Sequence, residues 1–103
     1  MASSIEYVNY LTEELSFCKD ITYRKMMGEY VVYYRQKVIG GIYDNRFLIK
    51  PVNTAKQMLP DASYEIPYPG AKPMILMENL EDKVFLQNLF EGMFAELPEK
   101  KKK

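Results

Sequence analysis

The sequence contains no histidine and no tryptophan, and Cys18 is its one cysteine. Without histidine, the chain lacks the commonest general base and the commonest metal ligand in proteins. A lone cysteine also excludes an internal disulfide and a Cys–His nucleophile. These absences predict a protein that is not an enzyme and that holds no cofactor or metal, with Cys18 as a small buried hydrophobe.

Long hydrophobic runs are also missing, since no apolar stretch approaches the roughly 20 residues that cross a bilayer. The first residues, MASSIEYVNY, show neither a basic leader before an apolar run nor a small-residue cleavage site. A single unpaired cysteine fits a reducing compartment. We therefore expect a cytoplasmic protein with no membrane span and no signal peptide.

The chain has no net charge, because 14 basic residues balance 14 acidic ones. It therefore lacks the strongly basic composition of a dedicated DNA-binding domain. The charges are nevertheless unevenly distributed, with a basic excess in residues 19–56 and an acidic excess in residues 78–99. The chain closes on four lysines. We predict one domain over residues 1–98 and a disordered lysine tail over residues 99–103.

Hydrophobic periodicity predicts a helix followed by an antiparallel meander. Ser3 and Glu6 have the spacing of a capping box, and apolar residues at helical intervals then indicate a helix over residues 4–17. Asp44 and Asn45 both tolerate positive φ, so they predict a two-residue hairpin turn. The expected strands are 22–27, 30–34, 38–43 and 46–50.

The hairpin turn determines which residues share a face of the sheet. A three-residue loop over Arg35–Lys37 extends the assignment to the preceding strand, whereas a two-residue loop would reverse that strand and bury Arg35. The residues expected to face the helices are Tyr30, Val32, Tyr34, Gly40, Ile42, Phe47 and Ile49. The residues expected on the outer face are Val31, Tyr33, Ile39, Tyr43, Arg46, Leu48 and Lys50.

The second half of the sequence predicts a short helix, a connector, a strand and a closing helix. Asn53 or Thr54 would cap the short helix, and four of the six prolines place residues 60–73 in a connector against the body. A strand over residues 74–77 precedes a helix capped by Asn79, in which Gly92 indicates close packing. The expected fold is a single two-layer α+β domain, in the order α-β(3–4)-α-β-α, with helices on one face of the sheet.

The paired carboxylates and the paired glycines in the sequence have structural explanations. The carboxylates Glu13-Glu14 fall on a helix, and Glu81-Asp82 fall at a helix start, where acidic residues interact favourably with the helix dipole. The pair Gly40-Gly41 lies inside a predicted strand and lacks the lysine of a phosphate loop, so it indicates a bulge or tight packing.

The outer face carries enough apolar surface to predict an interaction site. We interpret most tyrosines as packing residues, because tyrosine is common in strands for that reason alone. Val31, Tyr33, Ile39, Tyr43 and Leu48 would leave apolar surface uncovered, which favours a second copy or another protein as partner. The alternative is direct nucleic-acid binding through Arg46, Lys50, the outer tyrosines and the lysine tail.

The stretch KMMGEYVVYYRQKVIGGIYDNRFLIKPV carries a motif that begins at Met26. Together with the helix NTAKQML and the segment YEIPYPGAKPMILM, it resembles the N-terminal domain of the TfoX/Sxy family of competence regulators. That family shows methionine-phenylalanine-glycine-glycine-tyrosine after its first helix. Here Met26, Met27, Gly28 and Tyr30 match this motif, with Glu29 in place of the second glycine.

Further features of the resemblance are the strand that ends at Lys50 and the late strand at Met74, and it covers residues 4–96. It implies a two-layer domain similar to the secretion-chaperone type of fold. It also implies a non-enzymatic, cytoplasmic bacterial protein connected with the regulation of genes for DNA uptake. We therefore expect a small regulatory module that acts through protein–protein contacts.

Overall fold

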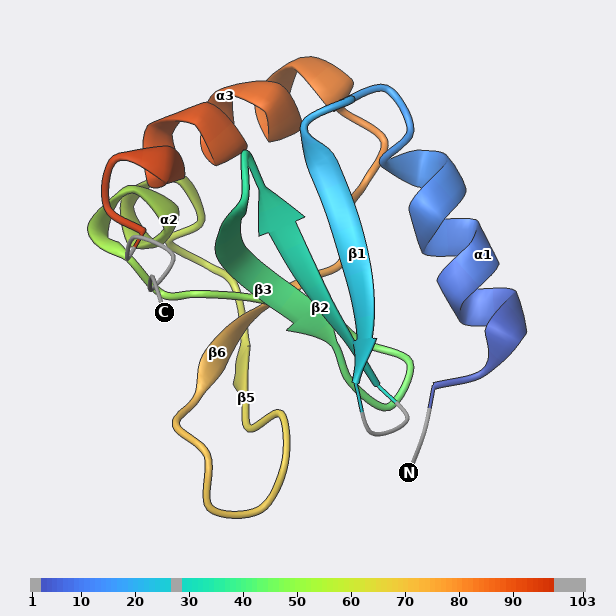
Figure 1. The fold of residues 1–103 in the computed structure, drawn as a ribbon. Coiled ribbons are helices and arrows are strands. Elements are labelled where there is room, and N and C mark those ends of the chain that lie inside the picture. Colours follow the sequence, from blue (N-terminus) through green and yellow to red (C-terminus); the bar gives the residue numbers. More distant parts are fainter. Residues whose placement is uncertain (1–2, 27–28, 98–103) are drawn as a thin grey trace, which may run out of the picture.

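The computed structural model describes residues 3–26 and 29–97, and within them six strands form one antiparallel sheet in the order β1-β2-β3-β4-β6-β5 (Figure 1). The predicted motif residues Met27 and Gly28 and the predicted lysine tail lie outside the described residues. The elements are α1 (Ile5–Glu14), β1 (Ile21–Met26), β2 (Glu29–Tyr34), β3 (Lys37–Ile42), β4 (Phe47–Ile49), α2 (Asn53–Met58), β5 (Tyr64–Glu65), β6 (Met74–Met77) and α3 (Lys83–Phe94).

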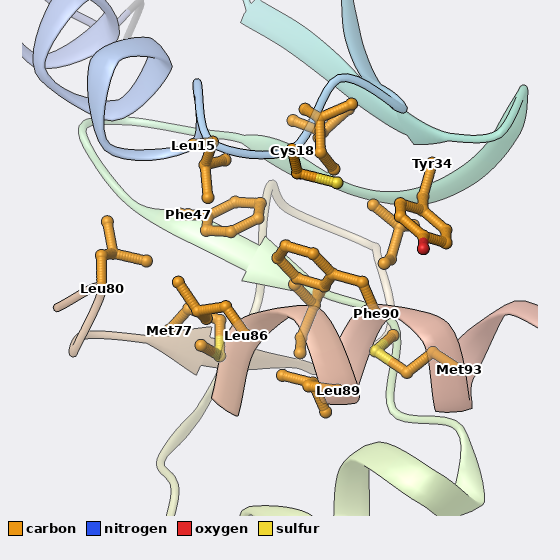
Figure 2. Packing of buried hydrophobic residues seen from close by; sticks show 14 of the residues in the cluster. Leu15, Cys18, Tyr34, Phe47, Met77, Leu80, Leu86, Leu89, Phe90 and Met93 are labelled. Atoms are coloured by element: carbon orange, nitrogen blue, oxygen red, sulfur yellow. The ribbon is translucent and has the colours of Figure 1, made fainter. Parts of the chain in front are cut away.

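The helices and one face of the sheet enclose a single hydrophobic core. Figure 2 shows Tyr34 of β2 and Phe47 of β4 pointing toward Phe90 of α3, and the rings of Tyr34 and Phe90 lie 5.9 Å apart. Leu15 and Cys18, from the segment after α1, reach the same core. Burial of these side chains drives the association of the two layers. The predicted two-layer α+β fold and the burial of Cys18 are thus confirmed.

The turn between β3 and β4 has the predicted form. Asp44 and Asn45 have φ values of 50° and 60°, and the backbones of Tyr43 and Arg46 exchange hydrogen bonds of 2.8 and 3.0 Å. Positive φ at both central residues gives a turn whose twist matches that of the strands. The predicted register is confirmed in β3 and β4, where Gly40 pairs with Ile49, Gly41 with Leu48 and Ile42 with Phe47.

The predicted three-residue loop after β2 is wrong. Arg35 and Gln36 form a two-residue turn with φ values of 51° and 72°, and Tyr34 pairs with Lys37. No glycine or asparagine stands at these positions to signal positive φ. Arg35 nevertheless stays exposed, with its guanidinium beside carboxylates of Asp20 and Glu91 at 3.5 Å.

Val32 and Tyr34 face the core as predicted, because a β-bulge corrects the register. Val32 pairs with Gly40 while Tyr33 pairs with Val38, which leaves Ile39 as the extra residue of β3. In such a bulge, two successive residues oppose one residue of the partner strand and lie on nearly the same side of the sheet. Ile39 is therefore in the core with 0% exposure, and its predicted place on the outer face is wrong.

Two predicted helix caps are shifted. Ser4 and not Ser3 caps α1, since its side chain accepts the N–H of Tyr7. Asp82 and not Asn79 caps α3. The predicted residue type is right for α1, while an aspartate replaces the predicted asparagine at α3. In each case the side chain that caps is the one nearest the first free N–H groups of the helix.

A carboxylate from the segment just after α3 caps α2, and not the predicted Asn53 or Thr54. The side chain of Glu96 accepts the N–H of Asn53 at 2.7 Å and the hydroxyl and N–H of Thr54. The hydrogen bond from Thr54, above all, holds the pKa of Glu96 below its usual value. Gly92 allows α3 to approach α2 closely, because a Cβ at this position would lie 2.8 Å from Cγ2 of Thr54. The predicted packing role of Gly92 is confirmed.

The bulge leads to a testable expectation about Gly40. A Cβ at this position would lie 2.1 Å from the carbonyl oxygen of Leu48, whereas the three atoms nearest to a Cβ at Gly41 all belong to the side chain of Tyr43. Because backbone atoms cannot rotate away, Gly40→Ala should lower the free energy of unfolding by about 3 kcal/mol. Urea denaturation of both alanine variants measures this, and an equal or smaller loss for Gly40→Ala than for Gly41→Ala would contradict it.

Candidate interaction groove

The seven residues predicted on the outer face do not form one accessible surface. Val31, Tyr33, Tyr43, Arg46 and Lys50 are half-buried. Leu48 is on the predicted side, because it alternates with the core residues of β4 and stays outside the core cluster. Like Ile39, however, it is 0% exposed, so the structure removes both residues from any contact surface.

Leu48 lies in an interior strand of the sheet, with β3 on one side and β6 on the other. Its cross-strand neighbours are Gly41 and Leu76, and β6 extends the sheet beside β4. Beyond β6, the sheet ends at β5, a short strand within the connector of residues 60–73 that the sequence did not predict. The predicted position of this connector against the body is confirmed, since Pro67 is buried.

A groove of about 990 Å³ opens where this connector faces the last residue of β1, the first residues of β2 and the β3–β4 turn. We call it the outer groove. Its lining comprises Met26, Glu29, Tyr30, Val31, Tyr43, Asp44, Arg46, Ile66, Pro67, Tyr68 and Pro69. It therefore brings together part of the predicted surface and part of the family motif, while Tyr33 and Lys50 are not part of its lining.

Arg46 attaches the connector to the sheet. Its guanidinium lies 2.6 Å from the carboxylate of Glu65 and donates to the carbonyl of Ile66 at 3.3 Å. A third bond, 3.1 Å long, goes to the carbonyl of Tyr43. Because a planar guanidinium directs several donors at once, one side chain holds both walls of the groove. The charge that the sequence suggested for contacting phosphates is thus paired within the protein.

Tyr43 forms the floor between these walls. Its ring lies over Gly41, where a Cβ would come within 2.6 Å of the hydroxyl oxygen, and its centroid lies 6.0 Å from that of Tyr68. Burial raises the pKa of the Tyr43 hydroxyl, and Tyr68 and Glu29 raise it further. The hydroxyl therefore remains protonated at neutral pH, so the floor is an uncharged aromatic surface with one polar end.

Exposed apolar side chains surround this floor. Met26 is 47% exposed, Ile66 is 51% exposed and Tyr68 is 58% exposed. Ile66 and Tyr68 are absent from the predicted surface because they stand in the irregular connector, where no strand alternation assigns a face. The available signal was their position between prolines in a segment expected to lie against the body.

Glu29, the residue that departs from the family motif, joins three segments at one end of the groove. One oxygen accepts the N–H and the hydroxyl of Ser3 at 3.2 and 2.9 Å, and the other accepts the N–H of Asp44 at 3.0 Å. Ser3 also accepts the N–H of Asn45 at 3.0 Å, and Asn45 accepts the N–H of Ser4. A glycine could make none of these side-chain bonds.

The predicted carboxylate groups have structural partners or exposed positions. Glu14 pairs with Lys83 at 2.8 Å, and Asp82 caps α3. No arrangement of three or more His, Cys, Asp or Glu side chains within residues 3–26 and 29–97 could hold a metal ion. None of the helices in the described part of the chain is both long and apolar enough to cross a membrane.

Comparison with known proteins identifies an uncharacterized relative of similar length. The chain is 29% identical over 99 residues to an uncharacterized 12.7 kDa protein in the trpE 5′ region of Spirochaeta aurantia. The alignment covers 95% of this chain and 86% of that protein. No family model matches the sequence, and no solved structure matches it. The resemblance to the TfoX/Sxy family stays a prediction.

The network around Glu29 predicts that Glu29→Ala destabilises the fold. The change leaves the N–H groups of Ser3 and Asp44 without their acceptor and releases the start of α1 from the β3–β4 turn. We expect a loss of about 1–2 kcal/mol in the free energy of unfolding, measured by urea denaturation. Glu13→Ala, an exposed change of the same type on α1, is the matched control. Equal stability of the two variants would show that the network contributes nothing.

Proposed function

We propose that this protein is a small, non-enzymatic interaction module that binds an extended apolar segment of a partner protein in the outer groove. The observation that carries the proposal is the exposure of Met26, Ile66 and Tyr68 around the aromatic floor formed by Tyr43. Apolar side chains exposed together at one concave site characterise binding surfaces more than ordinary protein surface.

The lining favours an extended segment as the occupant. Tyr30, Tyr43 and Tyr68 line the groove, and aromatic-lined grooves bind extended, proline-containing segments whose backbone loses little entropy on binding. The walls are already held by Arg46 and by the network at Glu29. Binding therefore requires little rearrangement of the module, which favours useful affinity from a modest contact area.

Nucleic-acid binding has weaker support. Arg24 and Lys25 of β1 are exposed, but Arg46 is paired with Glu65 and Tyr33 is half-buried. A single-strand binder needs available cations beside open aromatic rings. The two functions differ in their salt dependence, because phosphate contacts release counterions and apolar contacts do not.

The resemblance to the TfoX/Sxy family extends the proposal to a biological role. We place the module in the bacterial cytoplasm, where its partner is a protein connected with gene regulation. Self-association through the same groove is a variant of this proposal, since a second copy could supply the apolar segment. The support for the role is the order of motifs in the sequence, and the support for binding is the groove.

A selection from a library of random 12-residue peptides tests the binding function. We expect enriched peptides to be apolar or proline-containing and to shift the backbone NMR signals of groove residues. Ile66→Ser with Tyr68→Ser should weaken the best peptide by roughly tenfold or more. Val84→Ser with Ile5→Ser is the matched control, because both residues are exposed and apolar but lie outside the groove.

Two results would count against the proposal. Peptides that bind both double variants equally would place binding elsewhere on the molecule. A preference for single-stranded DNA over all peptides, with affinity falling steeply between 50 and about 200 mM salt, would favour the nucleic-acid alternative. Solution mass at the working concentration separates self-association from binding to another chain.

A further inference from the structure

A second groove, of about 450 Å³, lies where the end of α2, the end of β6 and the start of α3 meet. We call it the acidic groove. Its lining comprises Met58, Leu59, Pro60, Asp61, Ala62, Leu76, Met77, Glu78, Asn79, Asp82 and Phe85. Among the described residues, it shares none with the outer groove. It is therefore a separate place for a ligand.

The floor of the acidic groove is apolar. Leu59, Leu76 and Phe85 are half-buried, so each presents part of its side chain to the groove as well as to the protein. Leu59 and Phe85 pack against the core cluster, which holds them in place. A large apolar side chain from a partner would lose water against this floor and gain affinity from doing so.

The charges around this floor all have one sign. Asp61, Glu78 and Asp82 are exposed, and they come from the connector, the end of β6 and the N-cap of α3. Within the described part of the chain, no lysine or arginine lines the groove. Carboxylates from separate segments around one apolar floor make a negative site that complements a cation.

The carboxylates of Asp61 and Glu78 have no structural task among the described residues, where neither side chain makes an ion pair or hydrogen bond. Asp82, by contrast, accepts the N–H of Phe85 at 3.0 Å. The basic residue next in sequence, Lys83, is directed to α1. Its ammonium lies 2.8 Å from the carboxylate of Glu14 and also donates to the carbonyl of Leu80.

We propose that the acidic groove binds a partner protein through a segment that carries a large apolar side chain flanked by lysine or arginine. The apolar residue occupies the floor, and the flanking cations face Asp61 and Glu78. Charge complementarity selects this occupant over an acidic or neutral segment. The apolar floor selects it over a polyamine, which offers charge without an apolar side chain to bury.

The test uses a fluorescein-labelled probe peptide of sequence KLLKLLK and the full chain. Two companion peptides, KSSKSSK and ELLELLE, remove the apolar side chains or reverse the charge. Fluorescence anisotropy should give the tightest binding for KLLKLLK, with each companion at least about tenfold weaker. Backbone NMR shifts on titration should concentrate at Leu59, Leu76 and Phe85.

The decisive variant is Asp61→Asn with Glu78→Gln. It should weaken KLLKLLK by about fivefold to tenfold and leave the melting temperature unchanged or higher, because it removes unpaired like charges. Glu6→Gln with Glu13→Gln is the control, since it changes net charge equally at exposed positions on α1. The control should bind the probe within about twofold of the original chain.

Several outcomes would overturn the inference. Equal weakening by the two double variants would mean that the probe senses only net charge. Equal binding of KSSKSSK, or displacement of the probe by spermine at comparable concentration, would show that the apolar floor is not used. NMR shifts confined to the outer groove would assign the probe to that site, and the proposed function of the outer groove would stand independently.

Discussion

The two turns that flank β3 impose conflicting inside–outside patterns on its residues, and the rest of the sheet depends on how this strand accommodates both. The turn at Arg35–Gln36 places Lys37 on the same face as Tyr34, whereas the turn at Asp44–Asn45 places Ile42 on the face of Phe47. A regular strand would put one of these pairs on the wrong face. The bulge absorbs the extra residue and lets both hairpins face one core.

The bulge also determines which side chains remain for the outer face. Ile39 turns inward, and the glycine beside it accommodates the backbone of β4 at a distance that no side chain would allow. On the outer side, Gly41 leaves room for the ring of Tyr43, and that ring contacts Tyr68 of the connector. Gly41 thus contributes to the shape of the outer groove, because the absence of a side chain there leaves the space that the ring of Tyr43 occupies.

Two carboxylates in this protein accept hydrogen bonds from residues that are far away in the sequence. Glu29 accepts from Ser3 and Asp44, and Glu96 accepts from the first residues of α2. Each one satisfies backbone N–H groups of a segment that is remote from it in sequence. Asp61 and Glu78 differ from these residues, since neither bonds to any described residue, and that contrast separates the acidic groove from the structural carboxylates.

The sequence by itself determined the elements other than β5, the α+β class and the β3–β4 turn, because local periodicity and turn chemistry act over a few residues. The inward residues of β2 were predicted correctly from a loop that is wrong, because the bulge in β3 compensates for the shorter turn. The sequence missed the two-residue turn at Arg35–Gln36, where neither residue type signals positive φ, and hence the burial of Ile39. It also could not place Ile66, Tyr68 or Asp61, which lie in a connector without alternation. Only the tertiary structure decided both grooves, because each is formed by segments far apart in the chain whose packing no local pattern records.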